Sequence, residues 1–210
     1  MKKLIIAMLM AAPFFPAAAN LVTNGSFEAT AQGSGSWSIY PSVSGWTGIG
    51  HGIEVRNNVA GSAIDGHNFV ELDTTRNSSM AQTLTGDAGT YLLSFWYQTR
   101  PNTSKATNGL SFSLDGVDLG SVLLSSDAAA LDYNWHQYTS LVDFDGSGDL
   151  RFNAIGTSDS YGSSLDNIEF TAIVPELQIA AAVPEPGTTA LVLAALAAAG
   201  LASRRRKIQS

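Results

Sequence analysis

Short apolar and aromatic runs, separated by Gly, Asn, Asp and Ser, fill the middle of the chain. Several of them alternate apolar and polar residues with a period of two, which is typical of a strand with one buried face, and none keeps a helical period. The pattern predicts strands at residues 52–57, 68–73, 79–85, 90–99, 110–114, 117–124, 135–144, 149–155 and 167–173. We therefore expect an all-β body.

Two of these runs are especially informative. Residues 110–114 read Leu-Ser-Phe-Ser-Leu, and Asp115-Gly116 separates them from the next run. Because both positions of an Asp-Gly turn tolerate a positive φ, the pattern predicts a β-hairpin here. Residues 91–97 are nearly continuous in apolar residues, as in a central strand that is covered on both faces.

Short strands with frequent turn signals, over about 150 residues, indicate two packed antiparallel sheets. The expected fold is a β-sandwich of the jelly-roll kind, spanning residues 20–173. Ala-rich residues 127–131 are the place where one turn of helix is expected, and residues 174–182, with a Val-Pro-Glu step and an Ala run nearby, read as a linker.

The N-terminus has the layout of a secretory signal peptide, predicted over residues 1–19. Two lysines come first, residues 4–15 are mostly apolar, and small residues lead up to a cleavage site between Ala19 and Asn20. The alternative, a transmembrane helix, is disfavoured because the apolar run is short and two prolines interrupt it.

The last residues combine three features in a fixed order. Pro184, Glu185 and Pro186 precede an apolar stretch at 188–202, which a basic cluster at 204–207 follows. The set, predicted over residues 183–210, resembles the PEP-CTERM sorting signal of Gram-negative, exopolysaccharide-producing bacteria. The resemblance implies export by the Sec route, a transient stay in the inner membrane through one apolar helix, and cleavage at the Pro-Glu-Pro core by exosortase.

A permanent stop-transfer anchor is the alternative reading of the tail. Fifteen residues of helix span about 22 Å, which is short for a hydrocarbon core about 30 Å thick. Ala, the main residue of the stretch, is also weakly hydrophobic. The basic cluster stays on the cytoplasmic side, so an exported body lies across the membrane and ends at the cell surface or outside the cell.

The charge of the exported part excludes one class of partner. Six of the eleven Lys and Arg residues lie in the two terminal segments, whereas only one of the eighteen Asp and Glu residues does. Residues 20–183 therefore carry five basic and 17 acidic side chains, a net charge of −12. A nucleic-acid binder needs Lys and Arg to neutralise phosphates, so this charge excludes nucleic acid as a partner.

There is no cysteine, so the fold depends on its core or on a metal rather than on disulfides.

Motifs spread over the body carry a second resemblance. Residues 24–28 read Asn-Gly-Ser-Phe-Glu, residues 65–73 Asp-Gly-His-Asn-Phe-Val-Glu-Leu-Asp, and residues 165–168 Leu-Asp-Asn-Ile. This succession resembles the galactose-binding-like jelly rolls of carbohydrate-binding modules and of the domain-of-unknown-function 642 family. The resemblance implies a structural Ca²⁺ held by Glu28 and Asp166. Otherwise Glu28 is a solvated turn residue and Asp166 caps a loop through its own backbone.

Sugar recognition uses flat aromatic faces and a few hydrogen-bonding groups in a concavity. The available aromatic residues are Trp37, Tyr40, Trp46, Trp96, Trp135 and Tyr161. Trp96 and Trp135 lie in strand patterns, so we expect them in the core. Trp37, Tyr40 and Trp46 lie in a Gly- and Ser-rich stretch expected to be loop, and Trp37 and Trp46 are the candidate platform, although a Trp that plugs the sandwich is the alternative for Trp46.

Arg100 is the third candidate for the ligand surface, because it ends a predicted strand and is one of few basic residues in the body. Its alternative role is an ion pair with a nearby acid.

Catalytic signatures are missing from the sequence: the three histidines have no metal-binding spacing, and no Gly-x-Ser-x-Gly elbow occurs. Acid pairs such as Glu71 with Asp73 suggest glycosidase carboxylates, but with so many acids chance accounts for them.

We expect, from these features, a non-catalytic exported protein whose jelly roll binds exopolysaccharide. A structural or adhesive surface protein without a sugar pocket is the second hypothesis, and a carbohydrate-active enzyme the third.

Overall fold

The computed structural model describes residues 19–122 and 133–173. The segments predicted as signal peptide, helical turn at 127–131, linker and sorting tail lie outside these residues. The strands are β1 (Ser36–Tyr40), β2 (Ser42–Val43), β3 (Trp46–Ile49), β4 (Ile53–Asn57), β5 (Phe69–Glu71), β6 (Ser79–Thr85), β7 (Gly89–Gln98), β8 (Leu110–Leu114), β9 (Val117–Val122), β10 (His136–Phe144), β11 (Ser147–Ala154) and β12 (Ser164–Ala172), with a 3₁₀ turn η1 (Lys105–Thr107).

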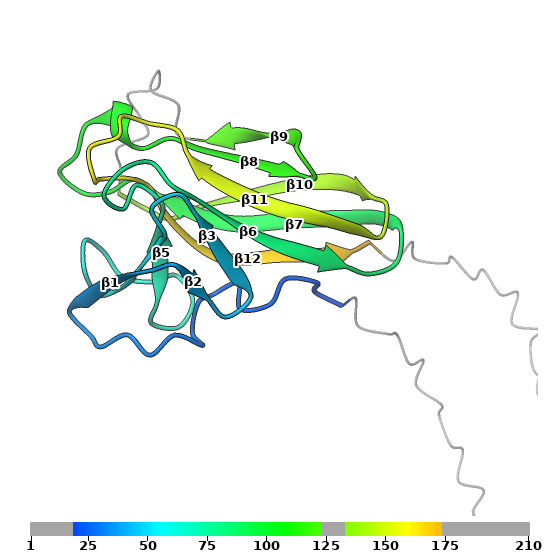
Figure 1. Cartoon of the computed structure of the whole chain (residues 1–210), viewed down its shortest axis with the longest axis horizontal. Coiled ribbons are helices and arrows are strands. Elements are labelled where there is room, and N and C mark those ends of the chain that lie inside the picture. The colour runs from blue at the N-terminus through cyan, green and yellow to red at the C-terminus, as the bar shows by residue number, and fades with distance from the viewer. Residues whose placement is uncertain (1–18, 123–132, 174–210) are drawn as a thin grey trace, which may run out of the picture. The chain divides into compact units, whose positions relative to one another are not determined.

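The strands form two antiparallel sheets stacked face to face (Figure 1). The first, sheet A, has the order β1-β4-β5-β12-β7-β10, and the second, sheet B, has the order β2-β3-β6-β11-β8-β9. The predicted all-β sandwich is thus confirmed. No helix among the described residues has the length and hydrophobicity to span a bilayer.

The predicted hairpin is confirmed at the turn between β8 and β9. Leu114 pairs with Val117, and the two residues between them have φ values of 52° (Asp115) and 80° (Gly116). These are the left-handed values that an Asp-Gly turn of this kind requires. A register shift between Phe112 and Ser113 adds a bulge that the alternation of the sequence does not reveal.

The sequence pattern does not predict strands β1, β2 and β3, because Gly and Ser dominate residues 36–49, which form them. Trp37 and Tyr40 lie in β1, and Trp46 begins β3, so the prediction that these residues lie in loops is wrong. The strands are short and follow one another through tight turns, one of which contains Gly45 at φ 81°. Backbone pairing at a sheet edge, rather than side-chain pattern, makes these residues extended.

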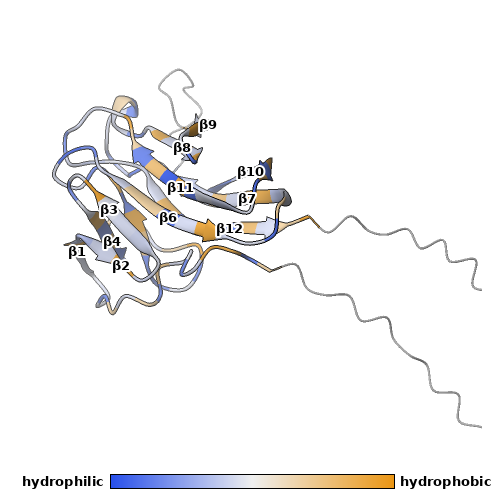
Figure 2. Cartoon of the chain, turned by 45° about the vertical axis from the view of Figure 1, so that its right-hand side comes forward, coloured by the Kyte–Doolittle hydropathy of each residue, from blue (hydrophilic) through white to orange (hydrophobic). Residues whose placement is uncertain are grey.

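The outer faces of the two sheets differ. Along much of β6 and β11 of sheet B, buried residues alternate with more exposed ones, and β11 contains strongly hydrophilic residues (Figure 2). In sheet A, every residue of β4 and β5 is buried. Residues 58–68 account for this, because they lie over the outer face: Trp135 Nε1 donates to the carbonyl of Ser62, and Gly61 approaches the Gln98 side chain.

Strand β7, expected to be central, lies between β12 and the edge strand β10. Its outer-facing Trp96 is half-buried, and so is Trp135. Trp135 packs edge-on against Phe69 at 5.9 Å, on the outer side of sheet A. The prediction that Trp96 and Trp135 belong to the core is therefore wrong, since both lie on the side of the sheet that faces the covering loops.

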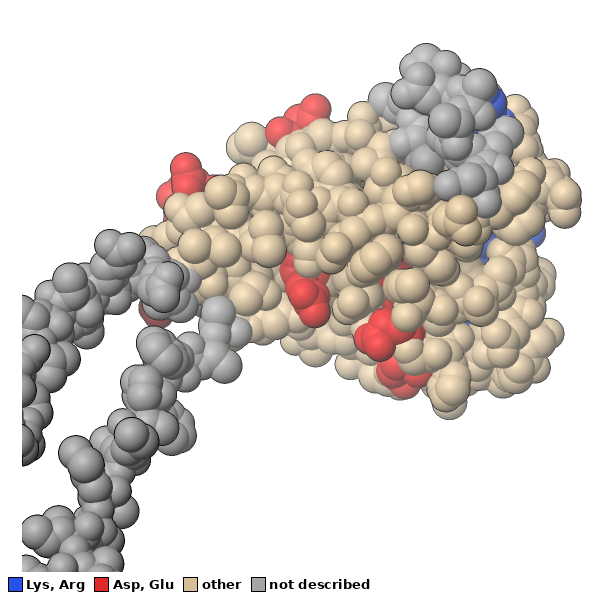
Figure 3. Space-filling view, turned by 180° about the vertical axis from the view of Figure 1, so that it is seen from behind, with Lys and Arg blue, Asp and Glu red and all other residues tan. Residues whose placement is uncertain are grey.

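Seen from behind, the surface shows scattered Asp and Glu, whereas Lys and Arg appear only along one edge (Figure 3). This agrees with the acidic composition of the exported part.

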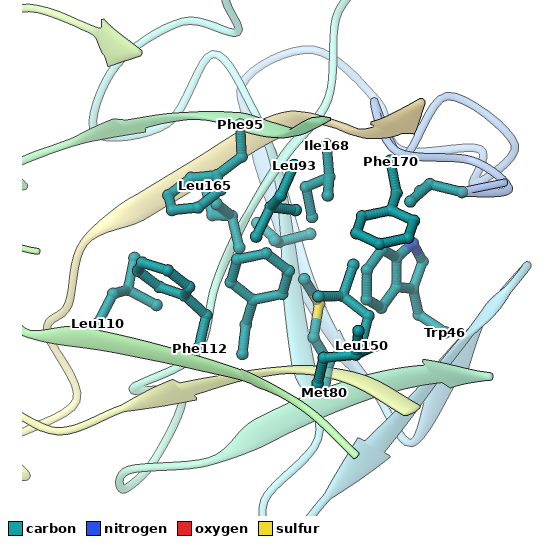
Figure 4. Packing of buried hydrophobic residues seen from close by; sticks show 14 of the residues in the cluster. Trp46, Met80, Leu93, Phe95, Leu110, Phe112, Leu150, Leu165, Ile168 and Phe170 are labelled. Atoms are coloured by element: carbon teal, nitrogen blue, oxygen red, sulfur yellow. The ribbon is translucent and has the colours of Figure 1, made fainter. Parts of the chain in front are cut away.

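Apolar side chains from both sheets meet between the layers (Figure 4). Phe95 stands at the centre, with ring contacts to Phe112 at 5.0 Å and Phe152 at 5.1 Å. Trp46 is 1% exposed and packs on Phe27 and Phe152. Its indole Nε1 donates to the carbonyl of Asn24. This aromatic core supplies the main stabilising area of the domain.

The sandwich has two distinct ends. At one, which we call the tail end, Asn20 pairs with Thr171 close to the start of β7, so the described chain begins beside the end of β12 (Figure 1). At the other, the loop end, β7 finishes at Gln98 and the connections β7–β8 and β11–β12 lie. The ten residues of β7 separate the two ends by about 30 Å.

Candidate functional site

A pocket of about 490 Å³ opens at the loop end. Three connections contribute to it: the β4–β5 loop, the β7–β8 loop and the β11–β12 loop. Its lining consists of Ala60, Arg100, Pro101, Asn102, Thr103, Ser104, Asp159 and Tyr161. Residues of different connections that are 40 to 101 positions apart in the chain are thus brought to one place by the sandwich topology.

Arg100 lines this pocket and also makes the ion pair that was its alternative role. Its Nη1 lies 3.0 Å from each carboxylate oxygen of Glu71, which confirms the predicted ion pair with an acid. Its guanidinium also lies over the ring of Tyr161, with 4.5 Å between Cζ and the ring centroid. A guanidinium held between a carboxylate and an aromatic face keeps part of its donor fork toward the pocket.

Glu71 belongs to a chain of alternating charges below the pocket. Arg56 Nη1 lies 2.5 Å from its Oε2, and Arg56 Nε lies 2.7 Å from Glu54 Oε1. The side chains of Arg56 and Glu71 are fully buried. Burial raises the pKa of Glu71 to about 8, and the two guanidiniums oppose the rise without cancelling it.

Tyr161 stands on a loop that a second buried carboxylate fixes. Asp73 Oδ2 accepts the backbone N–H of Asp159 at 3.0 Å. Asp159 in turn accepts the hydroxyl of Thr107 at 2.6 Å and the N–H of Tyr161 at 3.3 Å. Burial raises the pKa of Asp73 as well. The Tyr161 ring remains 46% exposed, so one side of it is open to a ligand.

Asn108 fixes the opposite wall. It is 1% exposed; its Oδ1 accepts the N–H of Arg100 at 2.8 Å, and its Nδ2 donates to Thr103 Oγ1 and to the carbonyl of Ser104. The loop that carries the hydroxyl and amide groups of the pocket is therefore fixed from inside the fold. An exposed aromatic ring with convergent hydrogen-bonding groups in a concavity is the arrangement that polyhydroxylated ligands require.

Two other hollows, of about 380 and 560 Å³, lie on the outer face of sheet B. They share Ile49, Ala81 and Asp149 as lining residues. No aromatic side chain lines either of these two hollows. We therefore take the loop-end pocket as the candidate site.

The predicted metal ligands meet at one loop. Glu28 Oε1 accepts the N–H groups of His67 and Asn68 at 2.8 and 2.6 Å. Asp166 Oδ2 accepts those of Ile64 and Asp65 at 2.9 and 3.1 Å, and its Oδ1 accepts the N–H of the following residue. Both carboxylates thus hold residues 64–68. Glu28 is exposed, as the alternative reading of the sequence expects, but it is tied to this loop.

A calcium ion takes about six to eight oxygen ligands. The described residues contain no group of three or more His, Asp or Glu side chains that could hold a metal, so amide and backbone oxygens would have to complete a site. Two observations fit a cation. Asp166 is fully buried among neutral N–H donors, and burial raises its pKa to about 7. Asn68 Oδ1, next to the loop, is buried without a hydrogen-bond partner among the described residues.

Of the two residues of the predicted aromatic platform, Trp46 is contradicted by the structure and Trp37 stays a prediction. Trp46 lies in the core, as the alternative reading has it, and its ring offers no face to a ligand. Trp37 is 53% exposed on edge strand β1, but it does not line the loop-end pocket. The aromatic residue in the pocket is Tyr161. The sequence pattern does not single out its hydrogen-bond partner Asp159, and it offers Glu71, the partner of Arg100, only as one half of an acid pair with Asp73. The only local signal was an aromatic residue within a Ser- and Gly-rich stretch.

Residues 182–207 match the family model of the PEP-CTERM protein-sorting motif. The predicted sorting signal, with Pro184, Glu185 and Pro186 inside the match, is confirmed. The motif implies export of the protein and its processing by exosortase at the membrane. A search of curated proteins found no match to the chain.

Several solved structures are similar to the chain. They include a family 35 carbohydrate-binding module from Clostridium thermocellum (18% identity, 66% of this chain and 99% of that chain, TM-score 0.45). A second is TmCBM61 in complex with β-1,4-galactotriose (16%, 74% and 100%, 0.49). A third is the K1 cleaved adhesin domain of Lys-gingipain from Porphyromonas gingivalis (16%, 66% and 98%, 0.49). At these identities and scores, the function of this chain has to be argued from its own residues.

Proposed function

We propose that this exosortase-sorted protein is a non-catalytic saccharide-binding protein of the cell surface or extracellular matrix, and that the loop-end pocket is its binding site. The observation that carries the proposal is the open ring of Tyr161 stacked on Arg100 inside a concavity of fixed hydroxyl and amide groups. The ring supplies apolar area for a sugar face, and the guanidinium edge supplies donors for its hydroxyls.

The sorting signal gives this pocket a context. A protein that passes through the inner membrane and is then cut near Pro184–Pro186 leaves the cell next to secreted polymers. Exopolysaccharide of the producing cell is the proposed partner. The pocket lies at the end of the sandwich opposite to Ile173, so the chain leading to the sorting motif does not start beside it.

Binding can be tested with the purified exported protein on an array of polysaccharides that includes β-1,4-galactan, xylan and polygalacturonate. Tyr161→Ala is expected to reduce affinity for the bound polymer at least about fivefold, because aromatic stacking contributes about 1 kcal/mol or more per contact. Tyr133→Ala is the matched control, since Tyr133 is 41% exposed but lies outside the pocket.

Three results would redirect the proposal. Binding that survives Tyr161→Ala but disappears with Trp37→Ala would move the site to β1. Absence of binding to every polymer on the array would favour a structural or adhesive role without a sugar pocket. Release of reducing ends from a bound polymer would make the protein an enzyme.

The metal is a separate proposal: Glu28 and Asp166 hold a structural Ca²⁺, which when bound would offset the charge of the buried carboxylate. The orphaned Asn68 Oδ1 and the burial of Asp166 support it. A chelator is expected to lower the melting temperature, and Ca²⁺ to restore it, because an ion that binds only the folded state stabilises that state. A melting temperature that the chelator leaves unchanged would overturn the proposal.

The processing step has its own readout. Mass spectrometry of the exported protein is expected to show a chain that begins at Asn20 and lacks the apolar stretch 188–202. A full-length tail in that fraction would favour the permanent anchor instead.

A further inference from the structure

We propose that the segment formed by β5 and the two residues after it positions both walls of the saccharide pocket, through Glu71 on the Arg100 side and Asp73 on the Tyr161 side. If the pocket binds saccharide, as proposed above, these two buried carboxylates set its affinity without touching the ligand. Both are positioning residues, and neither lines the pocket.

The register of sheet A places Glu71 under the pocket. Glu71 pairs with Glu54 of β4 on one side and with Ser164 of β12 on the other. Its backbone is thereby fixed in the interior of a sheet, and its side chain, 0% exposed, has Arg56 on one side and Arg100 on the other. A carboxylate held in this way gives the guanidinium of Arg100 one preferred place.

Arg100 needs such a partner because its side chain is long. Free in solution it would populate many rotamers, and a ligand that used it would have to immobilise it. The contact of Nη1 with both oxygens of Glu71, together with the Tyr161 ring 4.5 Å away, removes this freedom before a ligand arrives.

Asp73 acts on the other wall. It is 0% exposed, and the loop backbone packs directly against it, because a Cβ added to Gly162 would lie 3.0 Å from Asp73 Cβ. Asp73 Oδ2 accepts the N–H of Asp159, and Asp159 accepts the N–H of Tyr161. The carboxylate therefore sets the course of the loop just where the exposed ring begins.

The two carboxylates are two residues apart, and both side chains lie next to the same glycine, because a Cβ added to Gly162 would lie 3.0 Å from Asp73 Cβ and 3.3 Å from Glu71 Cγ. The last residue of β5 and a residue just beyond its end thus supply a support for each wall. The acid pair that chance could explain in the sequence has a defined place in the fold.

The first test measures the affinity of the exported protein for the array polysaccharide that the wild type binds, at about pH 9, so that Glu71 is ionised. Glu71→Gln and Asp73→Asn keep the shape of each side chain. Each is expected to weaken binding about three- to tenfold, as the ordering of one long side chain or loop passes to the ligand. Glu169→Gln, an exposed acid on β12 remote from the pocket, is the matched control and should bind like the wild type.

Double-mutant cycles separate positioning from general loosening. Glu71→Gln is expected to add nothing to Arg100→Ala, and Asp73→Asn nothing to Tyr161→Ala. Additive losses, or wild-type affinity in both single variants, would overturn the proposal. If Glu71→Gln does not fold, Arg100→Lys tests the same contact from the partner's side, since an ammonium cannot reproduce the fixed fork of a guanidinium.

A second readout needs no ligand. The Tyr161 ring is expected to shift the side-chain NMR signals of Arg100 upfield, and Glu71→Gln should move them toward free-arginine values. Unchanged signals would overturn the positioning role even if saccharide binds. If the wild type binds no polymer while the signals do move, the proposed function fails and the positioning stands.

Discussion

The two ends of the sandwich differ in the kind of side chain that they bury. At the tail end three aromatic rings close the core: Tyr91 stacks on Phe170 at 4.7 Å, and Phe144 packs edge-on against both at 5.2 and 5.4 Å. At the loop end Glu71 and Arg56 are buried and Arg100 is half-buried, with further buried polar atoms that lack partners among the described residues. Apolar closure there is replaced by charge pairing.

The difference separates stability from function. Burial of the aromatic rings at the tail end stabilises the folded state through the apolar area removed from water. Buried charges contribute little net stability, and each needs a partner of opposite charge within hydrogen-bond distance. Proteins place such groups where a defined arrangement of side chains is needed, and the loop-end pocket lies directly above them. Variants at the two ends should therefore fail in different ways.

The largest effect is expected at the tail end. Phe170→Ala removes a ring that is 0% exposed and should lower the free energy of unfolding by about 3–5 kcal/mol, through lost burial and the cavity left between Tyr91 and Phe144. Urea denaturation measures the change. Leu141→Ala, on a side chain that is 65% exposed, is the control and should change stability by less than about 0.5 kcal/mol. Equal effects would mean that the tail end is not a packed core.

At the loop end Glu71→Ala is expected to cost about 3 kcal/mol at pH 9, because it leaves the buried guanidinium of Arg56 without one of its two carboxylates. Unlike Phe170→Ala, it should also impair saccharide binding. Denaturation and binding measured on the same preparations check both statements. A variant with normal stability would show that Arg56 finds another partner.

The pH dependence of stability sharpens the comparison further. Burial raises the pKa of Glu71 to about 8, so between its ordinary value of 4.5 and 8 the folded state holds a proton that the unfolded chain has released. The free energy of unfolding should therefore fall as pH rises through this window, by up to about 1.4 kcal/mol per pH unit, and level off above it.

Asp73 and Asp166 have raised pKa values of the same sign, so the difference between wild type and Glu71→Gln isolates Glu71. That difference should shrink with rising pH. A constant difference across the window would show that Glu71 is already ionised in the folded state at low pH.

Sheet B was the easier half to predict. Strands β6 and β8 have the bounds that their alternation indicates, because one face of sheet B is open to solvent. The burial of both faces removes that signal from β4 and β5. Strand β12 begins before its predicted start, since its register shifts between Asp166 and Glu169, and such a bulge has no local pattern.

Of the residues at the candidate site, the sequence pointed only to one whose residue type is rare in the exported part. Arg100 was found because the exported part has few basic residues. Glu71 was one acid among many, and its meeting with Arg100 depends on sheet register rather than on any spacing in the sequence. The exposure of Tyr161 and the burial of Trp46 likewise follow from tertiary packing, which places the aromatic residue of one Gly- and Ser-rich stretch outside and that of another inside.

The smallest effect is expected at a tail-end turn, where backbone rather than packing is at stake. Gly116 has φ 80° and nothing lies within 4 Å of a Cβ added to it, so Gly116→Ala costs only the strain of the left-handed conformation, about 1 kcal/mol. Thermal unfolding measures it. Gly89→Ala is the control, because its Cβ also meets nothing and its φ is not positive. A larger loss at Gly116 would mean that the hairpin guides the pairing of β8 with β11, and not only its own turn.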